Sequence, residues 1–331
     1  MGMKAKPKDY RLVELRPDGR PAVRLLIYRT DGDKYIRLIS RHVSLEDLTG
    51  DSLQEEALDE VDALLIWKCP YTVLNSLTNL KWIQTTSAGI DQILDYLRER
   101  PETIVTTTKG MSTELISNYV LMTMLAFQWR LPTLLQRQQD HLWELVPTQP
   151  LSGLTCALVG VGNIGGRIAQ CVQELGMTVL GCKLRPQQVD HVDRMFEPDQ
   201  LGEMLQLADF VVLTLPLTKE TRGLIGATEF EMMKPGAYLI QVSRGGIVDE
   251  KALLNALESK QIAGAAVDVV EQEPLPHDHP LWDAPNVIVT PHVSGERVDH
   301  SDAVTQIFIH NLMAYPDVMR MQGLADTRLG Y

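Results

Sequence analysis

A glycine-rich segment in the middle of the chain constrains its fold more than any other feature. In "LVGVGNIGGRIAQCVQELG", Gly160, Gly162 and Gly165 have the G-x-G-x-x-G spacing between an apolar run and a helical pattern. In such a unit the first glycine makes a tight turn, the second lets the backbone approach a pyrophosphate, and the third lets the helix pack closely on the strand. The helix N-terminus, with Asn163 and Ile164, directs amide groups at the phosphates. The segment predicts dinucleotide binding; an ordinary glycine-rich turn is the alternative.

Short apolar runs alternate with helix-like segments along most of the chain, which is typical of parallel βαβ units. The first series of predicted strands is "AVRLLIYR", "DALLIWK", "KWIQTT" and "TIVTTT". The second series is "TCALVG", "TVLGC", "FVVLTL", "AYLIQV", "GAAVDV" and "VIVTP". A helix is predicted between the two series, from about Ser112 to about Pro132, followed by the helical segment "LPTLLQRQQDHLWEL". The pattern is helical again after about Gly295, so we expect two α/β lobes joined by helices.

The composition limits the possible partners and compartments. The 331 residues, 44% of them hydrophobic, are enough for two domains with cores of their own. The formal net charge of −12 argues against nucleic-acid and anionic-membrane partners, because both require a concentrated basic surface. Four scattered cysteines, a polar N-terminus and the lack of a run of about 18 apolar residues favour a cytoplasmic protein.

Three further segments follow the glycine segment in order: "VSRGGIVDEKAL", "AVDVVEQEPLP" and "VIVTPHVSG". Together with it they resemble the D-isomer-specific 2-hydroxyacid dehydrogenases, which include glyoxylate/hydroxypyruvate reductases and the catalytic part of phosphoglycerate dehydrogenase. The resemblance extends from "QTTSAGIDQI" to the terminal "RLGY". It implies two Rossmann-like or flavodoxin-like domains with parallel sheets and an active site in the cleft between them. The implied substrate-binding domain is 1–111 plus 297–331, and the implied dinucleotide-binding domain is 112–296.

The resemblance implies catalytic roles for three side chains that each follow a predicted strand. Arg244 matches the arginine that would bind the carboxylate of a 2-oxo acid through a forked ion pair and polarise its carbonyl. His292 would donate a proton to the carbonyl oxygen as the nicotinamide delivers hydride, and would accept a proton in the reverse reaction. Glu273 would hold the imidazole and favour its protonated form. The implied activity interconverts small 2-oxo acids and D-2-hydroxy acids.

Other site residues follow from the same resemblance. Asp268 matches the residue that orients the nicotinamide amide, and the backbone amides of Ala88 and Gly89 match a loop that binds the substrate carboxylate. The chain departs from the family at Asn118, where an acidic residue is usual. No metal site is expected, because the sequence places no third ligand beside the "HDH" at 277–279. The matched cofactor-wall positions are Leu215, Pro216, Val242 and Ser243.

The segment "VLGCKLRP" predicts which cofactor is preferred. An acidic residue at the end of the second strand would bind the adenosine ribose and favour NAD. Lys183 stands at that position, with Arg185 two residues later, so both basic groups can meet the 2′-phosphate of NADP. We therefore expect NADPH to be preferred, with NAD possible. The alternative is that both are solvated loop cations.

Two other functions and one assembly are compatible with the sequence. A dinucleotide-sensing binding protein similar to the C-terminal-binding-protein corepressors keeps the same three catalytic residues, but the chain lacks disordered interaction tails. A formate-dehydrogenase-like enzyme has glutamine where this chain has Glu273. The stretch "YVLMTMLAFQW" has more apolar residues than one buried stripe requires, which predicts a homodimer. Burial between the two lobes of one chain is the alternative.

Overall fold

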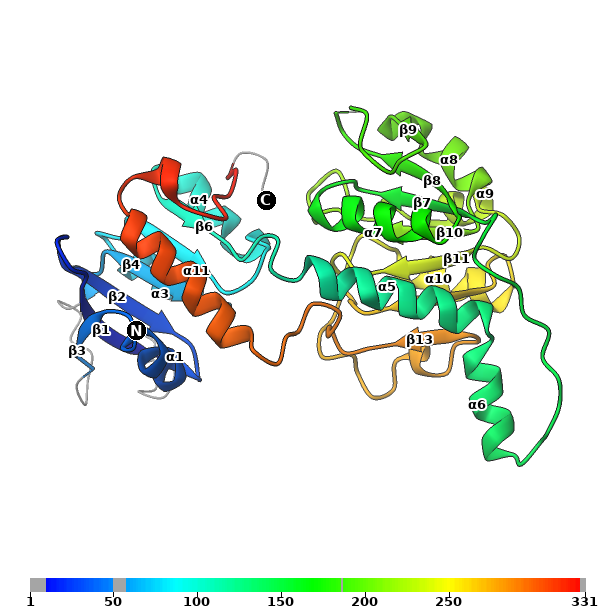
Figure 1. Cartoon of the computed structure of the whole chain (residues 1–331), viewed down its shortest axis with the longest axis horizontal. Helices are drawn as coiled ribbons and strands as arrows, with labels where there is room; N and C mark the ends of the chain where they lie inside the picture. Colours follow the sequence, from blue (N-terminus) through cyan, green and yellow to red (C-terminus); the bar gives the residue numbers. More distant parts are fainter. Residues whose placement is uncertain (1–9, 50–57, 186, 328–331) are drawn as a thin grey trace. The chain divides into compact units, whose positions relative to one another are not determined.

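The computed structural model describes residues 10–49, 58–185 and 187–327, so the terminal "RLGY" lies outside the described residues. The chain folds into two compact units (Figure 1). The split unit contains the residues up to Met111 and those from Arg297 onward. The central unit runs from Ser112 to Glu296. None of the helices among the described residues combines the length and apolar character needed to span a bilayer.

The split unit is built on a six-stranded sheet with the strand order β3-β1-β2-β4-β5-β6. Strands β2, β4, β5 and β6 are mutually parallel, as predicted, and each coincides with an apolar run of the sequence. The strands are β1 Arg11–Arg16, β2 Val23–Tyr28, β3 Ser44–Asp47, β4 Ala63–Ile66, β5 Trp82–Thr85 and β6 Ile104–Thr106.

An antiparallel edge completes this sheet and was not predicted. Strand β1 pairs antiparallel with both β2 and β3. In its sequence, "RLVELR", arginine and glutamate interrupt the leucines and the valine, and the β3 sequence "SLED" is mostly exposed. Neither strand has the continuous apolar run expected of a strand buried on both faces, because the strands at this edge keep polar side chains in contact with water.

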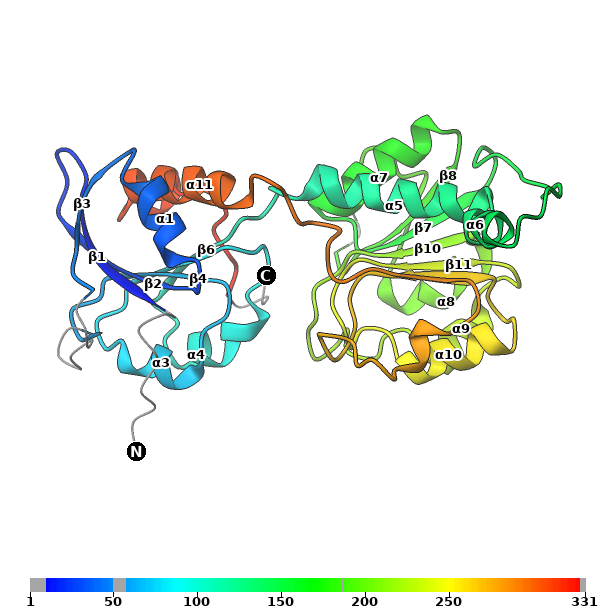
Figure 2. The same ribbon diagram turned by 90° about the horizontal axis from the view of Figure 1, so that it is seen from below.

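Helices cover both faces of the split-unit sheet. Figure 2 shows α1 and α11 on one face and α3 and α4 on the other. The last helix belongs to this unit because Phe308 of α11 stacks on Trp82 of β5, with ring centroids 5.2 Å apart. The helices are α1 Gly32–Ile39, α3 Tyr71–Ser76, α4 Leu94–Glu99 and α11 His300–Ala314, with the 3₁₀ turns η1 Asp91–Ile93 and η4 Val318–Arg320.

The central unit is built on a seven-stranded, fully parallel sheet with the order β13-β12-β11-β10-β7-β8-β9. The strand order reverses between β7 and β10, and a ligand of such a sheet binds at the carboxyl ends of the strands at this switch point. Six of these strands match predicted runs, while the short β9 does not. The strands are β7 Thr155–Val159, β8 Thr178–Cys182, β9 Arg194–Phe196, β10 Phe210–Leu213, β11 Tyr238–Gln241, β12 Gly264–Val267 and β13 Val287–Val289.

Two hydrophobic clusters hold the helices of the central unit on the two faces of its sheet. Residues of α5 and α7 share one cluster with the sheet, and residues of α8, α9 and α10 share the other. Figure 2 shows these two groups of helices on opposite faces. The helices are α5 Thr113–Gln128, α6 Leu131–Gln139, α7 Asn163–Glu174, α8 Leu201–Leu207, α9 Ala227–Met232 and α10 Glu250–Glu258, with the 3₁₀ turns η2 Pro198–Gln200 and η3 Pro280–Trp282.

The helical segment predicted after Pro132 is shorter than expected. Helix α6 ends at Gln139, and residues 142–150 form no regular element. Trp143 and Leu145 of this stretch are fully exposed within the described chain. A short helix depends on packing of its apolar face, and these side chains have no such packing here.

Candidate active site

The glycine loop joins β7 to α7 and has the conformation that its three glycines permit. Gly160 has φ +100°, and a Cβ there would lie 3.0 Å from the backbone nitrogen of Leu215. A Cβ on Gly165 would lie 2.3 Å from the Gly160 carbonyl oxygen, so a larger residue would push α7 away from β7. Gly162 is the N-cap of α7, and a Cβ there would point into open space. A helix N-terminus with open space in front of it fits the pyrophosphate of a dinucleotide.

The second strand of this unit ends beside the glycine loop. The Gly160 amide donates a hydrogen bond to the carbonyl oxygen of Cys182, the last residue of β8, at 3.0 Å. Lys183, which is partly buried, follows immediately, and Arg185 is exposed two residues later. The end of β8 therefore carries two basic side chains and no acidic one, which is the charge pattern expected for a site that accepts a 2′-phosphate.

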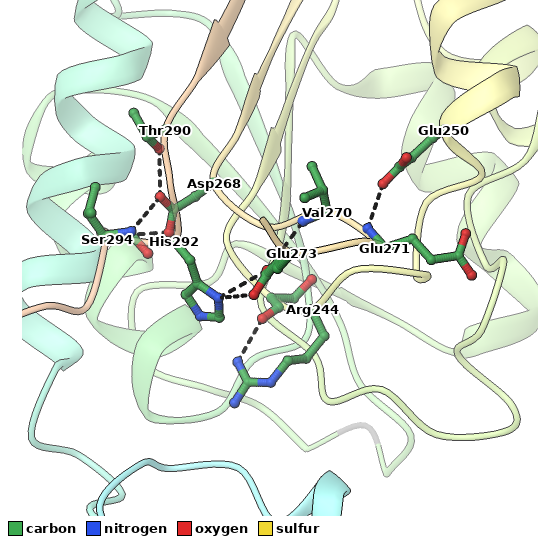
Figure 3. Close-up of polar contacts among 11 residues, drawn as sticks. Arg244, Glu250, Asp268, Val270, Glu271, Glu273, Thr290, His292 and Ser294 are labelled. Carbon is green, nitrogen blue, oxygen red and sulfur yellow. Dashed lines mark hydrogen bonds and ion pairs between the residues drawn. The ribbon is translucent and has the colours of Figure 1, made fainter. Parts of the chain in front are cut away.

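The turn after β11 explains the sequence "SRGG". A Cβ on Gly245 would lie 1.9 Å from the carbonyl oxygen of Val270, so only glycine fits there, and Gly246 has φ +81°. Arg244 is partly buried, and its guanidinium donates to the Ser243 carbonyl at 2.8 Å (Figure 3). The two glycines thus let the chain turn tightly after β11, and Arg244 lies at the carboxyl end of this strand.

His292 and Glu273 are in direct contact. The imidazole Nδ1 lies 3.0 Å from each carboxylate oxygen of Glu273 (Figure 3). Because an ionised carboxylate only accepts hydrogen bonds, Nδ1 carries a proton, and Nε2 is the nitrogen that can exchange a proton with a ligand. The two side chains are 43% and 32% exposed, which leaves the imidazole accessible.

Asp268 lies behind His292 and is only 2% exposed. Its carboxylate accepts hydrogen bonds from the Thr290 hydroxyl at 2.5 Å, the Val293 amide at 2.9 Å and the Ser294 amide at 3.0 Å (Figure 3). The His292 amide also donates to the Asp268 carbonyl at 2.9 Å. Asp268 therefore holds the turn that carries His292, a role that was not predicted from the sequence.

The predicted residues of the central unit lie along one edge of its sheet. Arg244, Asp268 and His292 follow β11, β12 and β13, which are neighbours in the sheet. The segment containing Leu215 and Pro216 follows the next strand, β10. Parallel strands end at the same edge, so these residues, the cofactor wall and the glycine loop are brought to one side, and Glu273 joins them through its contact with His292. Val242 and Ser243 are buried behind this edge.

The candidate substrate residues of the split unit lie at the carboxyl edge of the other sheet. Ala88 and Gly89 follow β5, and the Ser87 hydroxyl donates to the Gly89 carbonyl at 3.2 Å. At this edge there is also a hollow of about 540 Å³, which was not predicted although its residues follow strand ends. Burial raises the pKa of the Cys69 thiol to about 12, so this thiol stays protonated. The hollow is lined by Tyr28, Lys68, Cys69, Pro70, Asp91 and Gln92.

Among the described residues, His277 and His279 belong to no group of side chains that could bind a metal ion. The His279 Nε2 atom lies 3.4 Å from a carboxylate oxygen of Glu250, and its Nδ1 accepts from the Leu281 amide. Within the described residues, no three side chains of the metal-ligating types are grouped together.

Comparison with known proteins agrees with this geometry. Residues 121–294 match the family model described as the NAD binding domain of D-isomer-specific 2-hydroxyacid dehydrogenases. The chain belongs to this family. A glyoxylate/hydroxypyruvate reductase A from Yersinia enterocolitica is 31% identical over 277 residues, which are 82% of this chain and 88% of that protein. The family and its two-domain α/β fold, predicted from the sequence, are confirmed.

Solved structures of family members also superpose on the chain. A D-isomer-specific 2-hydroxyacid dehydrogenase family protein from Aeromonas salmonicida has a TM-score of 0.77 at 34% identity, covering 92% of this chain and 98% of that one. A family member from Xanthobacter autotrophicus, solved with NADPH and MES, has a TM-score of 0.80 at 28% identity, covering 93% and 99%. This D-2-hydroxyacid dehydrogenase is therefore an NAD(P)-dependent oxidoreductase of small 2-oxo and 2-hydroxy acids. The corepressor-like and formate-dehydrogenase-like alternatives are not favoured.

Proposed function

We propose that this dehydrogenase reduces glyoxylate, hydroxypyruvate or a related small 2-oxo acid with NADPH, as a cytoplasmic homodimer. The observation that carries the chemistry is the paired His292 and Glu273, with Arg244 at the same carboxyl edge of an NAD-binding unit. The substrate class is supported by the Yersinia relative, which is named as a glyoxylate/hydroxypyruvate reductase. The split unit would bind the substrate and the central unit the cofactor.

Arg244 would bind the substrate carboxylate. Its guanidinium offers several N–H donors in one plane, and the hydrogen bond to the Ser243 carbonyl fixes one side of that plane. A planar guanidinium suits a carboxylate, whose two oxygens match its geometry. The positive charge would also polarise the neighbouring carbonyl. The backbone amides of Ala88 and Gly89 are the groups that we propose for substrate binding in the split unit.

His292 would be the proton donor. When bound, the nicotinamide supplies the hydride that reduces the carbonyl carbon. The His292 Nε2 atom donates its proton to the carbonyl oxygen, while Nδ1 keeps its hydrogen bond to Glu273. The carboxylate of Glu273 stabilises the protonated imidazole before the transfer and fixes the ring orientation throughout. In the oxidative direction Nε2 accepts the proton.

The cofactor would be held by the glycine loop, the wall after β10 and β11, and Asp268. We assign the preference for NADPH to Lys183 and Arg185, because no acid follows β8 to repel a 2′-phosphate. A charge-assisted hydrogen bond contributes about 1.5 to 3 kcal/mol, or roughly tenfold to a hundredfold in affinity. The NADPH bound to the Xanthobacter family member supports this choice.

An exposed apolar surface on the central unit supports the homodimer. Large apolar side chains that gather on an exposed surface are uncommon on soluble monomers and mark interaction sites. The large exposed apolar side chains of α5, α6 and the following segment are Met122, Leu125, Trp129, Leu131, Leu135, Leu142, Trp143 and Leu145.

A substrate panel tests the proposed function. Glyoxylate, hydroxypyruvate, pyruvate and longer 2-oxo acids would each be offered to the purified protein with NADPH and with NADH. We expect the highest kcat/KM for glyoxylate or hydroxypyruvate with NADPH. Higher efficiency with NADH would overturn the cofactor preference alone, and turnover of none of these acids would overturn the proposed activity.

A further inference from the structure

We propose that Tyr119 and Thr290 position His292 for proton transfer. They act through Asp268, so neither is a catalytic residue itself. This inference rests on the proposed role of His292 as the proton donor. It assigns a function to a buried tyrosine of α5 that the chemistry of the site does not otherwise use.

His292 needs support because its backbone is in an unfavourable conformation. Its φ is +55°, in the left-handed region that residues other than glycine rarely adopt. Such a conformation is unfavourable for a residue with a side chain and persists only where the surroundings hold it. Three donors that flank His292 hold it here: the Thr290 hydroxyl and the Val293 and Ser294 amides, all bonded to the Asp268 carboxylate.

The direction of each hydrogen bond in this chain follows from the donors available. The two backbone amides can only donate, and the Asp268 carboxylate accepts from both of them and from the Thr290 hydroxyl. Because the single hydroxyl proton of Thr290 is used on Asp268, the Thr290 oxygen must accept from its other neighbour. That neighbour is the Tyr119 hydroxyl, at 2.8 Å.

Tyr119 is suited to this role by burial. It is 8% exposed, and burial raises its pKa to about 12. The phenol therefore stays protonated at any physiological pH and is a permanent donor to Thr290. A relay of hydrogen bonds then runs from Tyr119 through Thr290 to Asp268 and ends at the amides that flank His292.

A second contact ties the same helix to the other end of the His292 turn. The Ser112 hydroxyl, at the N-cap of α5, donates to the Gly295 carbonyl at 2.8 Å. A Cβ on Gly295 would lie 3.2 Å from the Ser112 Cβ, so the two segments are closely packed. Helix α5 shares a hydrophobic cluster with α7, and Glu114 and Arg167 form an ion pair between the two helices. The segment 290–295 is thus held against α5 before and after His292.

Single-atom changes in the relay test its role. Tyr119→Phe removes one oxygen, and Thr290→Val removes the hydroxyl while keeping the shape of the side chain. We expect kcat for 2-oxo acid reduction to fall about three- to tenfold in each, as the loss of one net hydrogen bond predicts. The KM values for the 2-oxo acid and NADPH should stay within about twofold, because Arg244 and the glycine loop are unchanged.

Matched variants separate the relay from general destabilisation. Thr290→Ser keeps the hydroxyl and should keep kcat within about twofold of wild type. Tyr238→Phe removes a tyrosine hydroxyl from the first residue of β11, at the opposite edge of the same sheet, and should leave kcat unchanged. Because Tyr119 acts only through Thr290, the double variant Tyr119→Phe/Thr290→Val should lose no more activity than Thr290→Val alone.

The results that would overturn the relay differ from those that would overturn the proposed function. Wild-type kcat in Tyr119→Phe, a change confined to KM, or multiplicative losses in the double variant would each contradict the positioning role. Failure of the unmodified protein to reduce any 2-oxo acid would instead contradict the proposed function. If Thr290→Val does not fold, Tyr119→Phe and Thr290→Ser still decide the question.

Discussion

The Nδ1 atom of His292 lies 3.0 Å from both carboxylate oxygens of Glu273, although 19 residues separate them in the chain. This hydrogen bond fixes which imidazole nitrogen exchanges a proton with the substrate. It also places a negative charge beside the ring that must be protonated for carbonyl reduction. Replacement of His292, of Glu273 and of Arg244 should therefore affect the reaction in different ways.

Replacement of His292 should affect turnover more than binding. In His292→Ala we expect kcat for reduction to fall by about a hundredfold to ten-thousandfold, the usual contribution of a placed acid or base. Binding of NADPH, measured by fluorescence titration, should be unchanged because the glycine loop is intact. Wild-type turnover in this variant would remove His292 from the mechanism.

Replacement of Arg244 should affect binding first. Arg244→Ala removes the positive charge that binds the substrate carboxylate, so KM for the 2-oxo acid should rise strongly, with a smaller loss in kcat because the carbonyl is less polarised. Arg244→Lys is the matched control, because it keeps the charge and loses the planar fork; it should recover only part of the affinity. An unchanged KM in both variants would contradict the assignment.

Replacement of Glu273 should lower turnover through the orientation of His292. Glu273→Gln keeps the size of the side chain but removes the negative charge that lies 3.0 Å from the imidazole Nδ1. A charge-assisted hydrogen bond is lost, so kcat for reduction should fall by about tenfold to a hundredfold, with little change in KM for NADPH. Steady-state rates of wild type and variant check this. Wild-type kcat in Glu273→Gln would show that the carboxylate does not act on the ring.

The basic residues after β8 should determine the cofactor preference. Lys183→Ala and Arg185→Ala should each raise KM for NADPH by about tenfold to a hundredfold for each hydrogen bond to the 2′-phosphate that is removed, with little change for NADH. Lys251→Ala, at an exposed lysine in the first turn of α10, is the control and should change neither. Equal effects on both cofactors would mean that these residues do not bind the 2′-phosphate.

The apolar surface of α5 and α6 should mediate dimer formation. Leu135 and Trp129 are 50% and 58% exposed, so the double variant Leu135→Glu/Trp129→Glu should fold and sediment as a monomer. The unmodified protein should sediment as a dimer at micromolar concentration. A monomeric unmodified protein would exclude this assembly.

Much of the fold was predictable from local sequence because most strands are continuous apolar runs and the glycine loop has a specific spacing. Arg244, Glu273 and His292 were candidates because the segments that carry them resemble the family. The structure shows that each follows one of the strands β11, β12 and β13. Strands β1 and β3 were missed because their exposed polar residues interrupt the apolar pattern.

The support behind His292 was not predictable from the sequence. Tyr119 and Thr290 are 171 residues apart, and only the packing of α5 brings them together. Asp268 supports the His292 turn by accepting hydrogen bonds from the backbone amides of Val293 and Ser294, which follow β13. Backbone amides leave no signal in the sequence. Similarly, α6 was predicted to be too long because apolar residues in 142–145 resemble a helix face but have nothing to pack against in the described chain.

The most direct test of the proposed mechanism is the configuration of the product formed from hydroxypyruvate. The purified protein would be incubated with hydroxypyruvate and NADPH, and the resulting glycerate would be resolved by chiral chromatography. We predict stoichiometric oxidation of NADPH with D-glycerate as the product, and loss of that product in His292→Ala. Formation of L-glycerate, or no reduction of hydroxypyruvate, would contradict the mechanism.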